Sequence, residues 1–267
     1  MHVTRVAAVV LRHFYLLRGS LTRVVPLFVW VAVDIVLWGF ITRYLNAVAG
    51  ARLDFVPALL GAVLLWDFCG RVMQGVTTAF FEDVWSRNFL NLFATPLSLT
   101  EYLVGLVVSS TVTSAVALVV MLALATGIFG LSFFAYGLTI VPFPLMLFLF
   151  GVALGILGSG MVLRLGPAAE WFVWPIPALV SPFVGVFYPL STLPPWMQHL
   201  ARLLPPSYVF EGLRRIIAGE AAPAGLLVTG AALAVAYVVL ACWVFRRVYH
   251  HAARSGLLVR YSAENVS

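Results

Sequence analysis

Long apolar runs alternate with short polar stretches along this sequence. A helix needs about 20 consecutive apolar residues to cross the hydrocarbon core of a membrane. The pattern therefore predicts an all-α membrane protein, one transmembrane domain over residues 1–267, with six spanning helices at about Val24–Thr42, Val56–Phe80, Tyr102–Phe129, Gly137–Leu163, Trp171–Tyr188 and Gly225–Phe245. Because six is an even number, we expect both ends of the chain on the same side of the membrane.

The fifth apolar run is rich in proline, with Pro175, Pro177 and Pro182 inside it and Pro167 and Pro189 at its edges. Proline lacks the backbone N–H that a helix interior needs, and its ring clashes with the preceding turn. Carbonyl groups freed in this way need partners inside the protein or a water-filled cavity. We expect this span to be kinked or broken, either as part of a pathway or as a kinked helix that serves packing alone.

Two short amphipathic segments follow within residues 191–219. The proline pairs at 194–195 and 205–206 each favour the first turn of a helix, where a missing N–H costs nothing. Glu211 and Arg215 are spaced i, i+4, which allows an ion pair on one helix face. Since neither segment is long enough to span the membrane, we expect an external re-entrant hairpin that covers the outer end of a pathway.

The polar stretch at residues 81–97 separates the second and third runs. Helical spacing from Phe81 to Phe93 predicts an amphipathic surface helix, whose polar side carries Glu82, Asp83, Ser86, Arg87 and Asn91. Pro96 ends that helix, and Ser98 with Glu101 has the spacing of a capping box that begins the next one. A surface helix joined by a sharp corner to a spanning helix is suited to receiving a push from outside the bilayer. An ordinary amphipathic connector is the alternative.

Residues 1–23 carry Arg5, Arg12, Arg18 and Arg23 among aliphatic side chains. This pattern is typical of an interfacial helix on the cytoplasmic leaflet. A signal peptide is the alternative, but arginines interrupt the apolar run and no small-residue cleavage site follows. We therefore predict an interfacial helix over this segment.

The composition is that of a membrane protein, and it excludes one kind of catalytic site. The chain has 267 residues, of which 63% are hydrophobic and 10% charged, with a mean hydropathy of +1.04. All sixteen cationic residues are arginines. A P-loop needs a lysine at the nucleotide phosphates, so an ordinary nucleotide-hydrolysing site is excluded from this sequence. Any work driven by ATP must come from a partner.

The net charge of +6 reflects arginines that gather near the two ends, namely Arg5, Arg12, Arg18, Arg23, Arg246, Arg247, Arg254 and Arg260. Cytoplasmic segments of membrane proteins carry such an excess of arginine. We therefore expect both termini in the cytoplasm and no binding of nucleic acid. It follows that residues 81–97 are cytoplasmic as well.

Three charged residues fall inside the predicted spans. Asp34 lies in the first span, and Asp67 and Arg71 lie four residues apart in the second. A charge at the bilayer centre costs about 2.5–3.5 kcal/mol, so these side chains should face protein or water. Two hypotheses follow. The residues form an ion pair that fixes helix packing, or they form a polar patch along a substrate path or a dimer seam.

The sequence gives little support for a catalytic site or a metal-binding site. The histidines all lie outside the predicted spans, and no cluster has metal-ligand spacing. Cys69 and Cys242 lie in separate apolar runs and indicate neither a disulfide framework nor a metal site. Gly155, Ser159 and Gly160 are small residues in one span, which favours close contact between helices.

Two segments resemble the ABC-2 type exporter permeases. Residues 82–105 resemble the stretch between the second and third spans of that family, with the sequence EDVWSRNFLNLFATPLSLTEYLVG. Residues 181–214 are similar to the family's most recognisable region, with the sequence SPFVGVFYPLSTLPPWMQHLARLLPPSYVFEGLR. The first segment departs from the family at SRNFLNLF, where an R-x-x-G-T-like run is common, and this departure leaves the subfamily and the substrate open.

The resemblance implies one permease half of an ATP-driven exporter in the bacterial inner (plasma) membrane. It implies a second permease copy, of like or unlike sequence, and two P-loop ATPase subunits that hold ATP and magnesium, with no cofactor in this chain. The expected substrate is hydrophobic or amphipathic, such as a drug, a lipid or a lipid-linked glycan. The expected direction is outward, from the cytoplasm or the inner leaflet.

The resemblance also implies roles for particular residues, each set on one part of the chain. The ATPase-coupling residues would be Glu82, Asp83, Trp85, Arg87 and Asn88, with the interfacial helix also in contact with the ATPase. The substrate pathway would include Asp34, Trp38, Asp67, Phe68, Arg71, Pro182 and Phe183. The external gate would include Trp196, Tyr208, Glu211 and Arg215.

Two other functions fit the composition. In an ion-coupled secondary transporter or channel, Asp34, Asp67 and Arg71 would form an ion or proton site, and transport would follow a proton gradient without any ATPase. A membrane-embedded enzyme or assembly factor acting on lipids would show turnover by the purified chain. The sequence offers no residue cluster for that second alternative.

Overall fold

The computed structural model describes all residues except 1, 20, 50–55, 87–88 and 257–267. Within that part every regular element is helical. The α-helices are α1 (Val3–Arg18), α2 (Leu21–Ala49), α3 (Gly61–Trp85), α4 (Phe89–Ala94), α5 (Leu99–Phe129), α6 (Pro142–Leu165), α7 (Glu170–Val173), α8 (Ile176–Val184), α9 (Pro195–Ala201), α10 (Pro205–Ile217) and α11 (Ala224–Arg254). The all-α fold predicted from the sequence is confirmed.

Five helical segments are long and apolar enough to cross a membrane, at Val29–Val48, Ala58–Trp85, Leu99–Phe129, Gly137–Leu165 and Ala224–Arg254. The expected span at Trp171–Tyr188 is divided into α7 and α8, with a break around Pro175, so the count of six long helices does not hold for the described residues. The physical reason is the proline content of the segment, because Pro175 and Pro177 supply no N–H to the preceding turn. The break itself was predicted.

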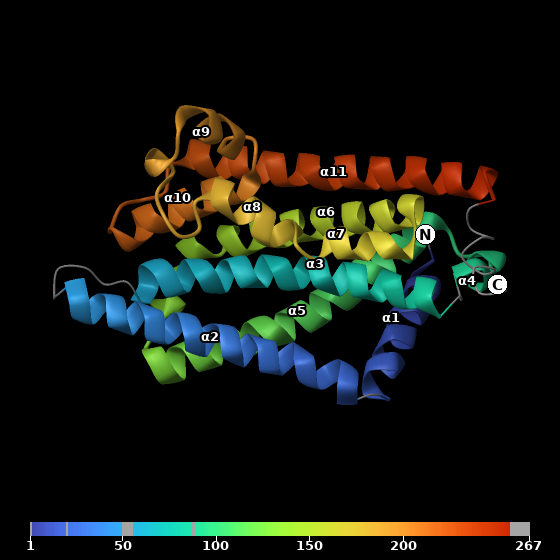
Figure 1. The fold of residues 1–267 in the computed structure, drawn as a ribbon, viewed down its shortest axis with the longest axis horizontal. Helices are drawn as coiled ribbons and strands as arrows, with labels where there is room; N and C mark the ends of the chain where they lie inside the picture. Colours follow the sequence, from blue (N-terminus) through green and yellow to red (C-terminus); the bar gives the residue numbers. More distant parts are fainter. Residues whose placement is uncertain (1, 20, 50–55, 87–88, 257–267) are drawn as a thin grey trace.

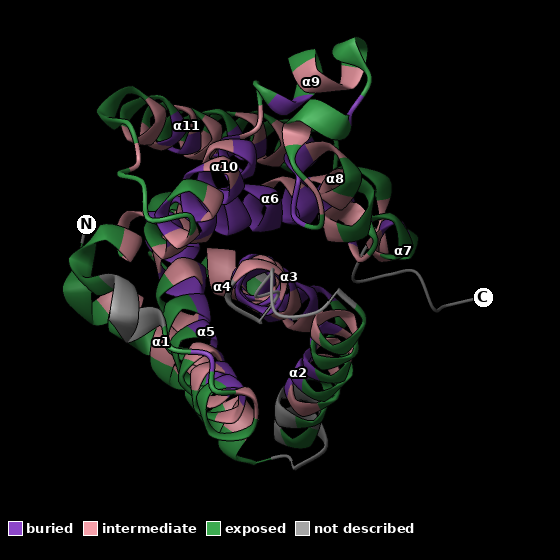
Figure 2. Ribbon diagram, turned by 90° about the vertical axis from the view of Figure 1, so that its left-hand side faces the viewer, coloured by how far each residue is buried: buried purple, intermediate pink, exposed green. Residues whose placement is uncertain are grey.

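The core centres on α3 and α6. Helix α6 packs against both α11 and α3, and α3 packs against α5. Figure 2 shows buried residues concentrated on α6 and α3, while α2 lies at the periphery with an exposed outer face. A second, smaller cluster joins α2 to α5 through Val31, Ile35, Met121 and Ala125.

Small residues on α6 allow α3 to approach closely. A Cβ atom added to Gly151 would lie 2.6 Å from the carbonyl oxygen of Cys69, and one added to Gly155 would lie 2.7 Å from Cβ of Val76. Ser159 continues the same stripe and is fully buried. Small residues bring two backbones together in a membrane, where dispersion contacts drive helix association. The close contact predicted around Gly155 and Ser159 is therefore confirmed.

The two ends of the bundle carry different elements (Figure 1). Helices α1 and α4 lie at one end together with the last turns of α11, and we call this the α4 end. The short helices α9 and α10 lie at the other, which we call the α9 end. Helices α7 and α8 follow one another along the bundle between the two ends, so this broken segment still joins them.

Replacing Gly155 by alanine tests the close packing of α3 and α6. The added methyl group meets Val76 and the Met73 carbonyl, so we expect Gly155→Ala to reduce stability by about 1–3 kcal/mol, the usual cost of overpacking. Gly127→Ala is the matched control, because a Cβ atom there has no neighbour within 4 Å. Thermal unfolding in detergent measures both variants. Equal melting temperatures for the two would contradict the packing described here.

Candidate functional site

The corner at the α4 end differs from the single surface helix expected between Phe81 and Phe93. Helix α3 continues to Trp85, and a separate short helix, α4, begins at Phe89. Phe81 and Val84 are buried in the main core, so the last turn of α3 belongs to the bundle. The amphipathic pattern is real, but its apolar side packs on protein: Phe81 meets Trp174, which follows α7, with ring centroids 5.9 Å apart, and Phe89 meets Tyr102 of α5 at 6.0 Å.

The capping box at the start of α5 is present as predicted. The Ser98 hydroxyl accepts a hydrogen bond from the Glu101 amide at 3.3 Å, and the Glu101 carboxylate accepts one from the Ser98 amide at 3.0 Å. The same carboxylate accepts from the His2 amide at 2.7 Å and lies 3.5 Å from Arg5 Nη1. Glu101 therefore caps α5 and also holds the first turn of α1 against it.

Asp83 forms the centre of a buried polar network at this corner. Its side chain has no solvent exposure, pairs with the Arg12 guanidinium and accepts a hydrogen bond from the Tyr102 hydroxyl at 2.7 Å. His13, also buried, lies with its ring nitrogens 3.0 Å from the Val9 carbonyl and 3.2 Å from the Ala79 carbonyl. Because these groups come from α1, α3 and α5, they join three helices at one point.

The predicted ATPase-coupling residues fall in different surroundings. Trp85 is 52% exposed at the end of α3, Glu82 is half-buried, and Asp83 is buried within the chain. Arg87 and Asn88 lie outside the described residues. Arg12 and Tyr102, the partners of Asp83, were not predicted from the sequence. The pattern does contain a signal for Arg12, because Arg5 and Arg12 lie two helical turns apart on one face of α1.

The three charged residues of the spans come together as predicted. Nη2 of Arg71 lies 3.4 Å from Oδ2 of Asp67 and 3.5 Å from Oδ2 of Asp34, so one nitrogen serves both carboxylates. The Arg71 side chain is 10% exposed, and its Nε has no hydrogen-bond partner among the described residues. Asp34 comes from α2 and is the most exposed of the three, at 37%. We call this group the central triad.

Two aromatic side chains of the predicted pathway, Trp38 on α2 and Phe183 on α8, each meet another ring. Trp38, one turn beyond Asp34, stacks on Phe187 with ring centroids 5.2 Å apart. Phe183 meets Trp196 edge to face at 6.4 Å. Pro182 is exposed and its carbonyl accepts a hydrogen bond from the Tyr188 hydroxyl.

Phe68 differs from the other predicted pathway residues. It is only 6% exposed and belongs to the main hydrophobic core, where Ala62, Leu65 and Val72 of the same helix are also buried. Within the described ranges, no group of three or more histidine, cysteine or acidic residues has an arrangement that could hold a metal ion.

At the α9 end, Arg214 fastens α10 to the segment that follows α8. Its guanidinium donates to the Gly185 carbonyl and to the Tyr188 carbonyl at 2.6 Å, and pairs with Glu211 at 3.2 Å. Glu211 also accepts from the Leu190 amide at 2.9 Å. Partial burial lowers the pKa of Arg214 below its ordinary value, and Glu211 opposes that shift. Two charged side chains thus bond backbone groups of residues 185–190, which follow the end of α8.

This arrangement corrects the pairing expected for Glu211. Glu211 pairs with Arg214 at i, i+3, whereas Arg215 is exposed. The carbonyls of Gly185 and Tyr188 draw in Arg214, and Arg215 lies on the next face of the helix. Tyr208, predicted at the gate, donates to the Arg202 carbonyl at 2.9 Å and joins α10 to the end of α9.

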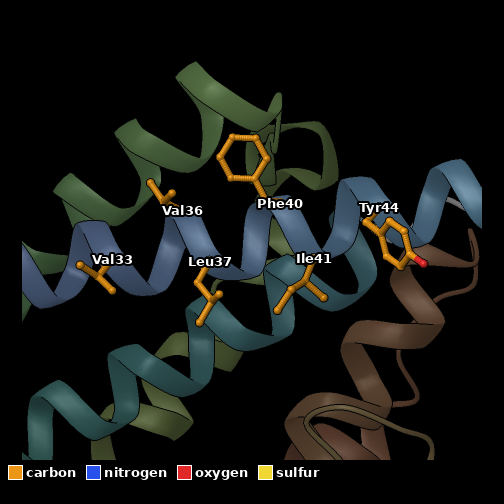
Figure 3. Close-up of a pocket in the computed structure, with 6 residues that line it drawn as sticks. All are labelled: Val33, Val36, Leu37, Phe40, Ile41 and Tyr44. Carbon is orange, nitrogen blue, oxygen red and sulfur yellow. The ribbon is translucent and has the colours of Figure 1, made fainter.

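A shallow apolar hollow follows the outer face of α2 (Figure 3). The side chains of Val33, Leu37, Phe40, Ile41 and Tyr44 extend outward from successive turns of the helix. The Asp34 carboxylate, on the same helix, lies instead against Arg71 of α3.

The helical fold and its five apolar segments define an integral membrane protein that crosses the bilayer several times. Over residues 49–243 the chain matches the family model described as ABC-2 family transporter protein. The chain therefore belongs to the ABC-2 family, the membrane components of ABC transporters, as its motifs indicated. No curated protein matches it.

Removing the charge of Asp83 tests the network at the α4 end. Breaking a buried ion pair by deleting one partner typically costs about 3–5 kcal/mol, because the other charge stays buried. We expect Asp83→Asn to release α1, which would raise amide hydrogen exchange across residues 3–18. Arg18→Gln, at an exposed position of α1, serves as the control. Unchanged exchange in Asp83→Asn would show that α1 docks without the ion pair.

Replacing Arg214 by glutamine tests the contact at the α9 end. A hydrogen bond to a charged group contributes about 1.5–3 kcal/mol, so Arg214→Gln should lower the melting temperature and expose residues 185–190 to proteolysis. The neighbouring change Arg215→Gln should alter stability by no more than about 0.5 kcal/mol, since its side chain is exposed. Equal effects of the two substitutions would argue against this contact.

Proposed function

We propose that this chain is the transmembrane subunit of an ATP-driven exporter, which moves a hydrophobic or amphipathic molecule outward from the cytoplasm or the inner leaflet. It would work with a second permease copy and two separate P-loop ATPase subunits, with both termini in the cytoplasm of a bacterial cell. Membership of the ABC-2 family is the observation that carries this proposal. The absence of lysine supports it, because ATP must then be hydrolysed by a partner.

The corner at the α4 end supports a role in energy coupling. Asp83 and Glu101 fasten α1 to α3 and α5, so a force on this corner reaches two spanning helices at once. Trp85 is exposed beside the network and offers a large aromatic anchor of the kind that dominates protein interfaces. In this proposal Trp85 and Glu82 contact the ATPase, and Asp83 positions the corner from inside.

The exposure of Asp34 supports a pathway on the α2 side. A carboxylate near the middle of a spanning helix does not face hydrocarbon, so its exposed third should meet water or protein. A second permease copy facing α2 would provide that cover and enclose a path between the copies. The contact made by Arg214 at the α9 end would then help to close the outer exit.

A secondary transporter is the competing function, and the central triad is the observation that favours it. Proton-driven transport would need no ATPase. The two functions therefore make different predictions for Trp85: an ATPase contacts this side chain in an ATP-driven exporter, and none does in a proton-driven transporter.

Site-directed photocrosslinking at Trp85 tests the proposal. We expect a benzoylphenylalanine in place of Trp85 to capture a P-loop ATPase in intact cells, identified by mass spectrometry of the product. The matched control is the same replacement at Trp243, which is equally exposed, at 54%, on α11. Capture of no ATPase at Trp85, in a protein that still exports, would argue for the secondary transporter.

A further inference from the structure

A second hollow lies between α6 and α11, toward the α4 end of the bundle. It encloses about 320 Å³ and opens to the surface. Gly160 leaves room where the two helices meet, since the nearest atom to a Cβ placed there is Cδ2 of Phe245 on α11, at 3.4 Å. The lining is apolar except for one cationic side chain, and it consists of Leu157, Gly160, Met161, Arg164, Leu165, Val244 and Val248.

The residues around this hollow place it at the boundary between hydrocarbon and lipid head groups. On α11, the guanidinium carbon of Arg247 lies 5.0 Å from the ring centre of Trp243, and both side chains are exposed. Trp171, shortly after the end of α6, is 76% exposed. Tryptophan gathers at membrane–water boundaries, and arginine at the cytoplasmic one. The hollow therefore has its apolar wall beside acyl chains and its charged end beside head groups.

Arg164 supplies that charged end. It is exposed in the last turn of α6 and has no ion-pair partner among the described residues, Glu170 included. Across the hollow, His251 follows Val248 by three residues on the same face of α11, and it is exposed. A guanidinium binds phosphate oxygens through two parallel hydrogen bonds, and an imidazole can donate one more. This end of the hollow therefore fits a phosphate group.

From this geometry we propose that the hollow binds an anionic phospholipid, with an acyl chain against the apolar wall and the phosphate at Arg164. Basic pockets between spanning helices at this level of a membrane bind anionic head groups. The lipid would be a bound component and not the transported molecule, because α11 lies across the bundle from α2 and the pathway proposed there (Figures 1 and 2). Its position in the inner leaflet rests on the cytoplasmic termini proposed above.

Competition between two lipids with the same acyl chains tests this site. The full chain, purified in neutral detergent, receives an equimolar mixture of phosphatidylglycerol, which is anionic, and phosphatidylcholine, which has no net charge. Native mass spectrometry then measures which lipid stays bound. We expect phosphatidylglycerol to be preferred at least about fivefold, the effect of one arginine near a charged head group. A net charge of +6 also attracts anionic lipid in general, so substitutions must locate the preference.

Matched substitutions separate the hollow from that general attraction. Arg164→Gln should reduce the preference about fivefold, because it removes the cation that lines the hollow. Arg246→Gln removes the same charge from an exposed position of α11 and should retain the preference, since residues two apart, such as 244 and 246, do not share a helix face. Met161→Trp should fill the hollow and reduce lipid binding while Arg164 stays in place.

Thermal unfolding gives a second readout. A ligand that binds the folded state stabilises it, so phosphatidylglycerol should raise the melting temperature of the unaltered chain and of Arg246→Gln more than that of Arg164→Gln. Glycerol phosphate, which has the phosphate but no acyl chain, should give no increase. Equal lipid preference in Arg164→Gln and Arg246→Gln would overturn the proposal, as would equal stabilisation by glycerol phosphate, which would indicate a site for free phosphate. Neither measurement needs an ATPase, so failure here is separate from failure of photocrosslinking at Trp85.

Discussion

The cost of removing charge from water governs where this chain places its ionised side chains. Asp83 is fully buried, and it is tolerated because the Arg12 guanidinium pairs with one of its oxygens and the Tyr102 hydroxyl donates a hydrogen bond to the other. Each partner comes from a different helix, so a single carboxylate fixes α1 against α3 and α5. Glu101 has a similar role on α5: its Oε2 caps the helix and also contacts Arg5, and its Oε1 accepts from the His2 amide. The geometry of the whole α4 end depends on these two carboxylates.

Charged side chains elsewhere in the bundle meet the cost of leaving water in other ways. At the α9 end, Arg214 and Glu211 neutralise each other while they satisfy the backbone that the proline-rich segment leaves open. In the middle, one nitrogen of Arg71 lies within 3.5 Å of both Asp34 and Asp67 and joins α2 to α3. Both ends of the molecule therefore hold paired charges that join neighbouring helices, and the centre holds two carboxylates that share one guanidinium.

Local sequence patterns predicted the features that depend only on residues close together in the chain. Apolar length located the spanning helices, the proline spacing predicted the break around Pro175, and the spacing of Ser98 and Glu101 predicted the cap of α5. The charged residues 34, 67 and 71 could be grouped because membrane burial leaves them few partners. The burial of Asp83 could not be predicted, because periodicity shows which face of α3 is polar but not that Arg12 and Tyr102 cover it. The choice between Arg214 and Arg215 likewise depended on distant carbonyls, which spacing along one helix does not reveal.

The composition of the native complex tests most directly whether ATP hydrolysis drives this protein. The chain is purified from its own membrane in mild detergent, and the proteins retained in comparable amount are identified and quantified by mass spectrometry. We expect a P-loop ATPase at about one copy per permease chain. A chain that purifies alone and still moves solute across liposomes under a proton gradient would contradict it.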